Sequence, residues 1–275
     1  MESDRLNPLE KETFYRIAAK TATQEEVENS LLRLTKMMAA HYEKPVILLV
    51  DEYDVPLAKA DEKGYYPEML DVVKGVMQVV KDNEALQTAV ITGCLRIAKE
   101  SIFTGMNNFV SDSIADPRLN EYFGFTQAQV DQLLQDTGLT AHASQLKEWY
   151  NGYCFGSVDV YCPWDVMNHI NALMSDNSCG PRNFWENTSD NSVIRSFLDR
   201  ADYSINEKFE ILLGGGYIKE TISDTLTYDT ATASQENLWS LLYLTVSLTK
   251  VKEDMLPDGA LEPGRTALKI PTKRL

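Results

Sequence analysis

The sequence predicts an α/β protein: a parallel-sheet core, then a helical region, then a small winged-helix-like α+β tail. Three observations lead to this prediction. Short aliphatic runs alternate with helical patterns near the N-terminus, helical patterns follow one another in the middle, and the end combines an apolar helix with two strand-like pieces. We place the parts at residues 1–112, 113–202 and 203–275.

The first part opens with a helix and a strand. Thr23 and Glu26 form a capping-box pattern, and apolar residues at helical spacing then predict a helix to about Tyr42. Pro45 interrupts the pattern. The five aliphatic residues Val46 to Val50 follow, and such a run predicts a strand buried on both faces, as in a parallel sheet.

A second helix and strand complete the alternation. Pro67 opens a helix with Val73 and Met77 on its apolar face, and residues 88–93 form another short apolar run. Helix, strand, helix and strand in this order are typical of a parallel layered sheet.

The middle and the tail are patterned differently. Thr126 and Gln129 cap a helix that Gly138 ends. The tail begins with a helix that the glycines at 214–216 end. An apolar helix from Leu238 and two strand-like pieces around a Pro/Gly-rich turn follow it. Further middle helices are expected at residues 146–150, 164–174 and 192–198.

Composition excludes several classes of function. The net charge is −15 and the pI about 4.7, so the chain alone should repel nucleic-acid phosphates. No apolar run approaches the roughly 20 residues that span a bilayer, and the four cysteines include no C-x-x-C pair. The three histidines form no metal-binding motif. We therefore expect a cytoplasmic protein that makes no membrane contact.

Acidic residues follow the first predicted strand directly. Asp51 and Glu52 would lie at the carboxyl edge of the sheet, where α/β proteins bind ligands. In P-loop nucleotidases the first acid after such a strand holds Mg²⁺ and an adjacent glutamate can activate water. The pattern "VILLVDE" matches this Walker B arrangement. The alternative, which the residues leave open, is that the acids only cap the next helix.

The second predicted strand ends in a polar residue at the same edge. In nucleotidases with an added strand, a side chain at the position of Thr92 contacts the γ-phosphate. A threonine at a strand end is also a common turn former, and spacing alone favours that role.

Six motifs in order carry a resemblance to a known family. The chain resembles the AAA-ATPase-like domain of a large group of uncharacterised bacterial proteins, which often continue into a PD-(D/E)XK nuclease-like domain. The resemblance covers roughly residue 46 to the C-terminus. The motifs are "VILLVDEYDVPL", "VITGCLRIAKESIFTGMNN", "LKEWYNGYCFG", "VYCPWDVMNHI", "FWENTSDN" and "LWSLLYLTVSLTKVKED" with "ALKIPTKRL".

The resemblance implies ATP and Mg²⁺ as cofactors and assigns roles to single residues. Asp51 would be the Mg²⁺ ligand and Glu52 the water-activating base. Thr92 and Arg96 would lie at the γ-phosphate side, Arg96 as a charge stabiliser. The remaining implied cofactor-binding residues are Asp54, Asn107 and Asn108.

One expected motif is missing. A member of this family should carry a glycine-rich phosphate loop ending Gly-Lys-Ser upstream of the first helix, and the chain contains no Gly-Lys dipeptide. That loop supplies the backbone amides and the lysine that neutralise the phosphates. We therefore expect weak or no ATP binding and an inactive chain, as in a fragment, a truncated protein or a decayed gene.

Two alternatives remain. The chain could be an interaction scaffold derived from an ATPase, which binds a protein partner or itself through the helical region. It could also be a DNA-associated module that uses the winged-helix-like tail beside a nuclease-like domain, although the acidic charge argues against this.

Overall fold

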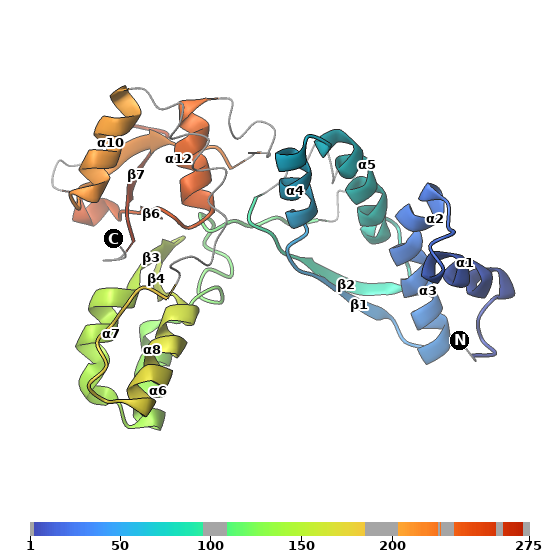
Figure 1. Ribbon diagram of the computed structural model, residues 1–275, viewed down its shortest axis with the longest axis horizontal. Coiled ribbons are helices and arrows are strands. Elements are labelled where there is room, and N and C mark those ends of the chain that lie inside the picture. The colour runs from blue at the N-terminus through green and yellow to red at the C-terminus, as the bar shows by residue number, and fades with distance from the viewer. Residues whose placement is uncertain are drawn as a thin grey trace. The chain divides into compact units, whose positions relative to one another are not determined.

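The protein is a mixed α/β chain with many helices and small sheets in a computed structural model (Figure 1). The structure describes residues 3–95, 109–184, 203–224, 226, 234–256 and 261–271. Two compact units emerge, the first built on residues up to Phe109 and the second on residues from Val110. The three-part division expected from the sequence stays a prediction.

The first unit contains mostly helices. The capping box at Thr23 is present, and the helix pattern ends at Tyr42 as predicted, but Asn29 divides it into two helices. The amide of Asn29 donates to the Glu25 carbonyl at 2.9 Å, and such local bonds compete with helix continuation. The helices are α1 (Pro8–Ala18), α2 (Gln24–Glu28), α3 (Ser30–Tyr42), α4 (Val55–Lys63), α5 (Tyr66–Met77) and the 3₁₀ turn η1 (Gln78–Val80).

Helix α4 was not expected from the sequence. It begins directly after Asp54, carries Pro56 in its first turn, and ends at Gly64 with a left-handed φ of 76°. Leu57 and Ala60 are fully buried, on the helix that packs beside α5. Its apolar face is only one turn long, which is too short for the periodicity to stand out.

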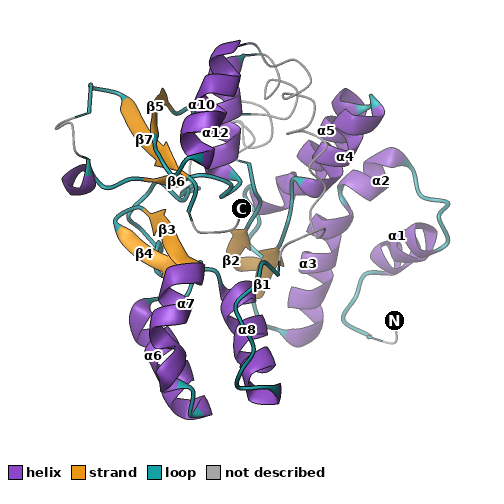
Figure 2. Ribbon diagram, turned by 60° about the vertical axis from the view of Figure 1, so that its left-hand side comes forward, coloured by secondary structure: helices purple, strands orange, loops and turns teal. Residues whose placement is uncertain are grey.

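The two predicted strands of the first unit form a parallel pair. Strand β1 (Val46–Val50) pairs with β2 (Leu86–Ile91) from Val46 opposite Leu86 to Val50 opposite Ile91. Figure 2 shows these short strands among the helices.

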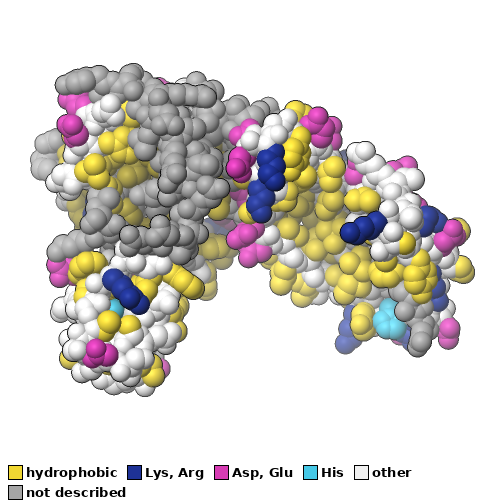
Figure 3. Space-filling view, viewed as in Figure 1, with side chains coloured by type: hydrophobic (Ala, Val, Ile, Leu, Met, Phe, Trp, Pro, Cys, Tyr) yellow, Lys and Arg dark blue, Asp and Glu magenta, His cyan; other side chains and the backbone are white. Residues whose placement is uncertain are grey.

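The expectation that β1 is buried on both faces is wrong. Ile47 is 57% and Leu49 74% exposed, whereas Leu48 on the other face is buried. Val90 of β2, opposite Leu49, is also exposed, and hydrophobic side chains gather over this region (Figure 3). The physical reason is that helices cover one face only and the sheet has two strands in the described chain.

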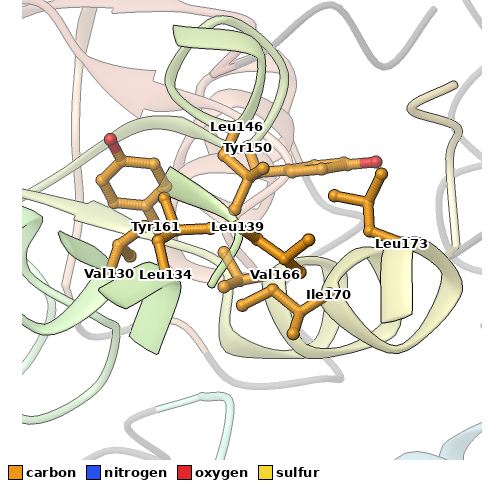
Figure 4. Packing of buried hydrophobic residues seen from close by; sticks show 9 residues of the cluster. All are labelled: Val130, Leu134, Leu139, Leu146, Tyr150, Tyr161, Val166, Ile170 and Leu173. Atoms are coloured by element: carbon orange, nitrogen blue, oxygen red, sulfur yellow. The ribbon is translucent and has the colours of Figure 1, made fainter. Parts of the chain in front are cut away.

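The second unit begins with a helical cluster around one core. The capping box at Thr126 and the left-handed Gly138 bound the first helix as predicted. Side chains from these helices and the following strands interdigitate in the core (Figure 4). The elements are α6 (Gln127–Thr137), η2 (Thr140–His142), α7 (Ala143–Tyr150), β3 (Asn151–Phe155), β4 (Val158–Tyr161) and α8 (Pro163–Ser175).

The middle region is not purely helical, because β3 and β4 form an antiparallel hairpin. The "YNGY" segment of the third motif continues from α7 into β3. Gly152 has a φ of 135°, and the register shifts beside it, so the glycine supplies an irregular backbone at this point. The hairpin is then buried through Tyr153, Phe155 and Val160.

The C-terminal part combines helices with a three-stranded antiparallel sheet in the order β5-β7-β6. The backbone amide of Cys154 in β3 donates to the Thr249 hydroxyl at 2.8 Å and ties the hairpin to this sheet. The winged-helix comparison stays a prediction, and the helix expected at 192–198 lies outside the described residues. The elements are α10 (Tyr203–Leu213), β5 (Ile218–Thr221), α12 (Gln235–Leu244), β6 (Thr249–Lys250), η3 (Glu253–Met255) and β7 (Arg265–Lys269).

Among the described residues, every helix is too short or too polar to cross a bilayer.

Candidate functional site at the carboxyl edge of the first sheet

Parallel pairing brings the ends of β1 and β2 to one edge of the sheet. The Thr92 amide donates to the Val50 carbonyl at 2.8 Å, so the pairing extends one residue beyond β2. Asp51 and Glu52 leave β1 at this edge, and Thr92 leaves β2 there. Open α/β sheets bind ligands at this edge, which makes it the candidate site.

Asp51 and Thr92 are in direct contact. The Thr92 hydroxyl donates a hydrogen bond to Oδ1 of Asp51. Asp51 is exposed, so its carboxylate remains accessible to a ligand. The two residues are separated by 41 positions in the chain, and the strand pairing alone brings them together.

Glu52 has an unusual backbone. Its φ is +53°, in the left-handed region that costs a residue with a Cβ roughly 1–2 kcal/mol. The amide of Val55 donates to the Glu52 carbonyl at 3.1 Å, and Glu52 itself is exposed. Non-glycine residues held in this region cluster at functional sites, where the surrounding structure enforces the strain.

Asp54 is placed differently from the first two acids. It is 1% exposed, and its Oδ2 accepts hydrogen bonds from the Cys94 and Leu95 amides, each at 3.0 Å. Although it precedes α4, its carboxylate makes no cap hydrogen bond to that helix. The side chain therefore faces the segment that leaves β2.

The thiol of Cys94 is affected by all three acids. Burial of the thiol raises its pKa above the ordinary value, and the negative charges of Asp54, Glu52 and Asp51 raise it further. A raised pKa keeps the thiol protonated at neutral pH, which makes Cys94 a poor nucleophile.

The donor set at this edge fits Mg²⁺. Within the described ranges, no three His, Cys, Asp or Glu side chains come together as a complete protein metal site. Mg²⁺ usually takes one or two carboxylates and completes its shell with water and phosphate oxygens. The exposed carboxylate of Asp51 beside the hydroxyl of Thr92 provides hard oxygen ligands of this kind.

Arg96, Asn107 and Asn108 lie outside the described residues. The structure thus brings Asp51 and Thr92 into contact, keeps Glu52 at the same edge, and turns Asp54 inward.

The N-terminal part of the chain matches a known family. Residues 4–103 fit the family model AAA-ATPase_like, described as predicted AAA-ATPase. This part of the chain is a predicted AAA-ATPase-like domain. The match includes both strands of the candidate site and begins upstream of the first motif that carried the resemblance.

One similar protein is an "Uncharacterized protein in vnfD 5'region" from Azotobacter chroococcum mcd 1. It is 32% identical over 124 residues, which are 44% of this chain and 24% of that protein. The chain thus aligns with about a quarter of the relative's length. No solved structure matches the chain.

Sequence reasoning missed two residues of the AAA-ATPase-like domain that shape its edge. The hydroxyl of Tyr53 donates to the Leu95 carbonyl at 2.7 Å. Gly93 lies against Tyr53 and Asp54 without room for a side chain. A glycine directly after a strand end was the available signal, but its neighbours come from a segment about 40 positions away, which the sequence does not indicate.

Proposed function

We propose that the AAA-ATPase-like domain binds a Mg²⁺–nucleoside triphosphate, with ATP as the expected ligand, at the carboxyl edge of β1 and β2. The bound nucleotide would serve as a conformational switch. The observation that carries this proposal is the contact between Asp51 and Thr92, which joins a carboxylate and a hydroxyl at the edge where such ligands bind.

Each residue has a role in this proposal. Asp51 holds the metal ion, and Thr92 lies at the γ-phosphate side, where its hydroxyl also orients Asp51. Glu52 accepts a proton from the attacking water, which is general-base work. Arg96 stabilises the charge of the transferring group, and Asn107 and Asn108 belong to the cofactor-binding set. Asp54, which the resemblance also assigned to this set, is enclosed and is left out of it.

Binding by this chain alone should be weak. Phosphoryl transfer depends on positioning and on neutralising the phosphate charge. The chain contains no Gly-Lys dipeptide and carries a net charge of −15, so the carboxylates face the triphosphate without the usual lysine. We therefore propose that the isolated chain does not turn over ATP.

Thermal unfolding with and without Mg²⁺-ATP tests the proposal. Ligand binding stabilises by mass action, so binding with a dissociation constant near 1 mM should raise the Tm by only about a degree or two at several millimolar ATP. Asp51→Asn should remove the shift. Glu62→Gln, on the exposed side of α4, is the matched control that should keep it.

Two outcomes would change the proposal. A shift that survives Asp51→Asn places the nucleotide elsewhere and overturns the assignment. Measurable ATP hydrolysis that Glu52→Gln abolishes would support the site but contradict the inactivity of the chain.

A second candidate function is an interaction scaffold, which binds a protein partner or a second copy. The exposed apolar side chains of Ile47, Leu49 and Val90 on one sheet face favour it. A complex of this kind should ignore ATP and Asp51→Asn, and Leu49→Lys should disrupt it. Light scattering with these variants separates the two candidates.

A further inference from the structure

The turns that follow β1 and β2 interlock at the candidate site. The Tyr53 amide donates to the Thr92 carbonyl at 3.0 Å, and the Tyr53 hydroxyl reaches the Leu95 carbonyl at 2.7 Å. In the other direction, the amides of Cys94 and Leu95 donate to Asp54. Tyr53 and Asp54 therefore both hold the turn that follows β2, which we call the second turn.

Gly93 shows how closely the two turns approach. A Cβ at this position would lie 2.6 Å from Oδ1 of Asp54 and 2.6 Å from the Tyr53 ring. These distances are far below van der Waals contact. The backbone of Gly93 does not have a left-handed φ, so the lack of space, and not the conformation, requires glycine.

Asp54 is too enclosed to meet a ligand in solution. It is 1% exposed, as is Leu95, whose amide it accepts. A buried carboxylate is retained when hydrogen-bond donors compensate its charge, and hydrogen bonds to a charged acceptor are stronger than neutral ones. The carboxylate therefore interacts with backbone amides of the second turn.

Thr92 lies between these contacts. Its amide donates to Val50, its carbonyl accepts from Tyr53, and its hydroxyl donates to Asp51. Anything that releases the second turn removes the fixed backbone from which the Thr92 hydroxyl orients Asp51. The orientation of the exposed acid therefore depends on the buried one.

We propose that Asp54 is a positioning residue, which fixes the Asp51–Thr92 pair by clamping the turn from Thr92 to Leu95 instead of contacting the nucleotide. Tyr53 and Gly93 complete this clamp. As far as nucleotide binding is concerned, the inference rests on the proposed function, but the clamp itself can be measured without any ligand.

Hydrogen exchange tests the clamp directly. The Cys94 and Leu95 amides should be protected in the wild-type chain. In Asp54→Ala their protection should fall roughly ten- to hundred-fold, the range for hydrogen bonds to a charged acceptor. Gly93→Ala should act in the same direction, and Tyr53→Phe, which deletes one hydroxyl, should have a smaller effect.

A destabilised control separates positioning from general loss of stability. Val79 is fully buried in the same unit and takes part in none of the hydrogen bonds of the clamp. Val79→Ala should speed exchange throughout the first unit, without singling out Cys94 and Leu95. Unchanged exchange of these two amides in Asp54→Ala would overturn the clamp.

Titration with Mn²⁺ in the presence of ATP, followed by electron paramagnetic resonance, tests the link to the site. Asp54→Ala and Gly93→Ala should weaken binding at least about ten-fold, and Val79→Ala should not. Wild-type binding that Asp54→Ala leaves intact would overturn the positioning role and keep the proposed function. Absence of wild-type binding together with lost amide protection in Asp54→Ala would reject the proposed function and support the clamp.

Discussion

The two-stranded sheets of the described chain differ in how far their apolar side chains are exposed. In β1 of the first unit, Ile47 is 57% and Leu49 74% exposed. In the β3–β4 hairpin of the second unit, Phe155 is 7% and Tyr161 1% exposed, because the hairpin packs between the helical core and the C-terminal sheet. An apolar run thus predicts a strand, but it does not tell whether both faces are covered.

Charged and polar groups show the reverse distribution. The first unit exposes Asp51 and Glu52 at a sheet edge and buries only Asp54 beside them, whereas the second unit buries Asp165 and His169 completely on α8. Exposed acids on a rigid edge are available to ligands, and fully buried polar groups serve the internal packing. This difference favours the first unit as the part that binds a ligand.

A matched pair of leucine truncations should show the largest difference between the units. Leu146 is fully buried in α7, and Leu146→Ala should cost the second unit about 3 kcal/mol. Leu49→Ala should cost the first unit about 0.5 kcal/mol or less, because the side chain already faces water.

The residues of the first unit include no tryptophan, so urea unfolding followed by tryptophan fluorescence reports on the second unit and on Leu146→Ala. Hydrogen exchange of the β1 amides reports on Leu49→Ala. A cost of several kcal/mol for Leu49→Ala would mean that something covers this sheet face in solution, and the comparison between the sheets would fail.

Acidic pH should also distinguish the two units, with a smaller effect than the leucine truncations. Burial lowers the pKa of His169, and the charges of His142 and Arg182 lower it further. Because the pKa of His169 is lower in the folded state, the contribution of its neutral form to the free energy of unfolding is complete above the unfolded-state pKa near 6.5. It is lost as the pH falls through the lower folded-state pKa.

The urea midpoint by tryptophan fluorescence should therefore be flat above about pH 6.5 and decline below it. His169→Gln, which cannot become charged, should flatten the decline. His142→Gln should flatten the decline less than His169→Gln does, because it removes only one of the charges that lower the pKa of His169. An equally steep decline in His169→Gln would assign the acid sensitivity to other groups.

The smallest expected effect concerns backbone strain at the site. Glu52→Gly should stabilise the first unit by up to about 1 kcal/mol, because glycine adopts a φ of +53° without a Cβ clash. Gly64→Ala, at a φ of 76° in a helix end with open space around it, should destabilise by a similar amount. A loss of stability in Glu52→Gly would show that its side chain, and not its backbone, matters to the fold.

Local sequence patterns predicted the structure correctly where it depends on interactions between residues close together in the chain. The capping boxes at Thr23 and Thr126 and the helix end at Gly138 occur as predicted, because they depend on residues three or four positions apart. The antiparallel hairpin from Asn151 to Tyr161 was missed, since its aromatic residues suit a helical core equally well.

The candidate site was predictable only in part. The alternation of apolar runs predicted that Asp51 and Thr92 would meet at one edge, and they form a hydrogen bond there. The inward turn of Asp54 and the tight fit of Gly93 were not predictable, because they depend on how two turns pack after the strands have paired.

The sequence by itself determined the capped helices, the two strands of the first unit and which acids follow the first strand, because these depend on local periodicity and capping. Only the tertiary structure decided which face of β1 stays exposed and which of the three acids is enclosed. Both outcomes depend on what lies opposite each side chain, and contacts between segments some 40 positions apart leave no local pattern.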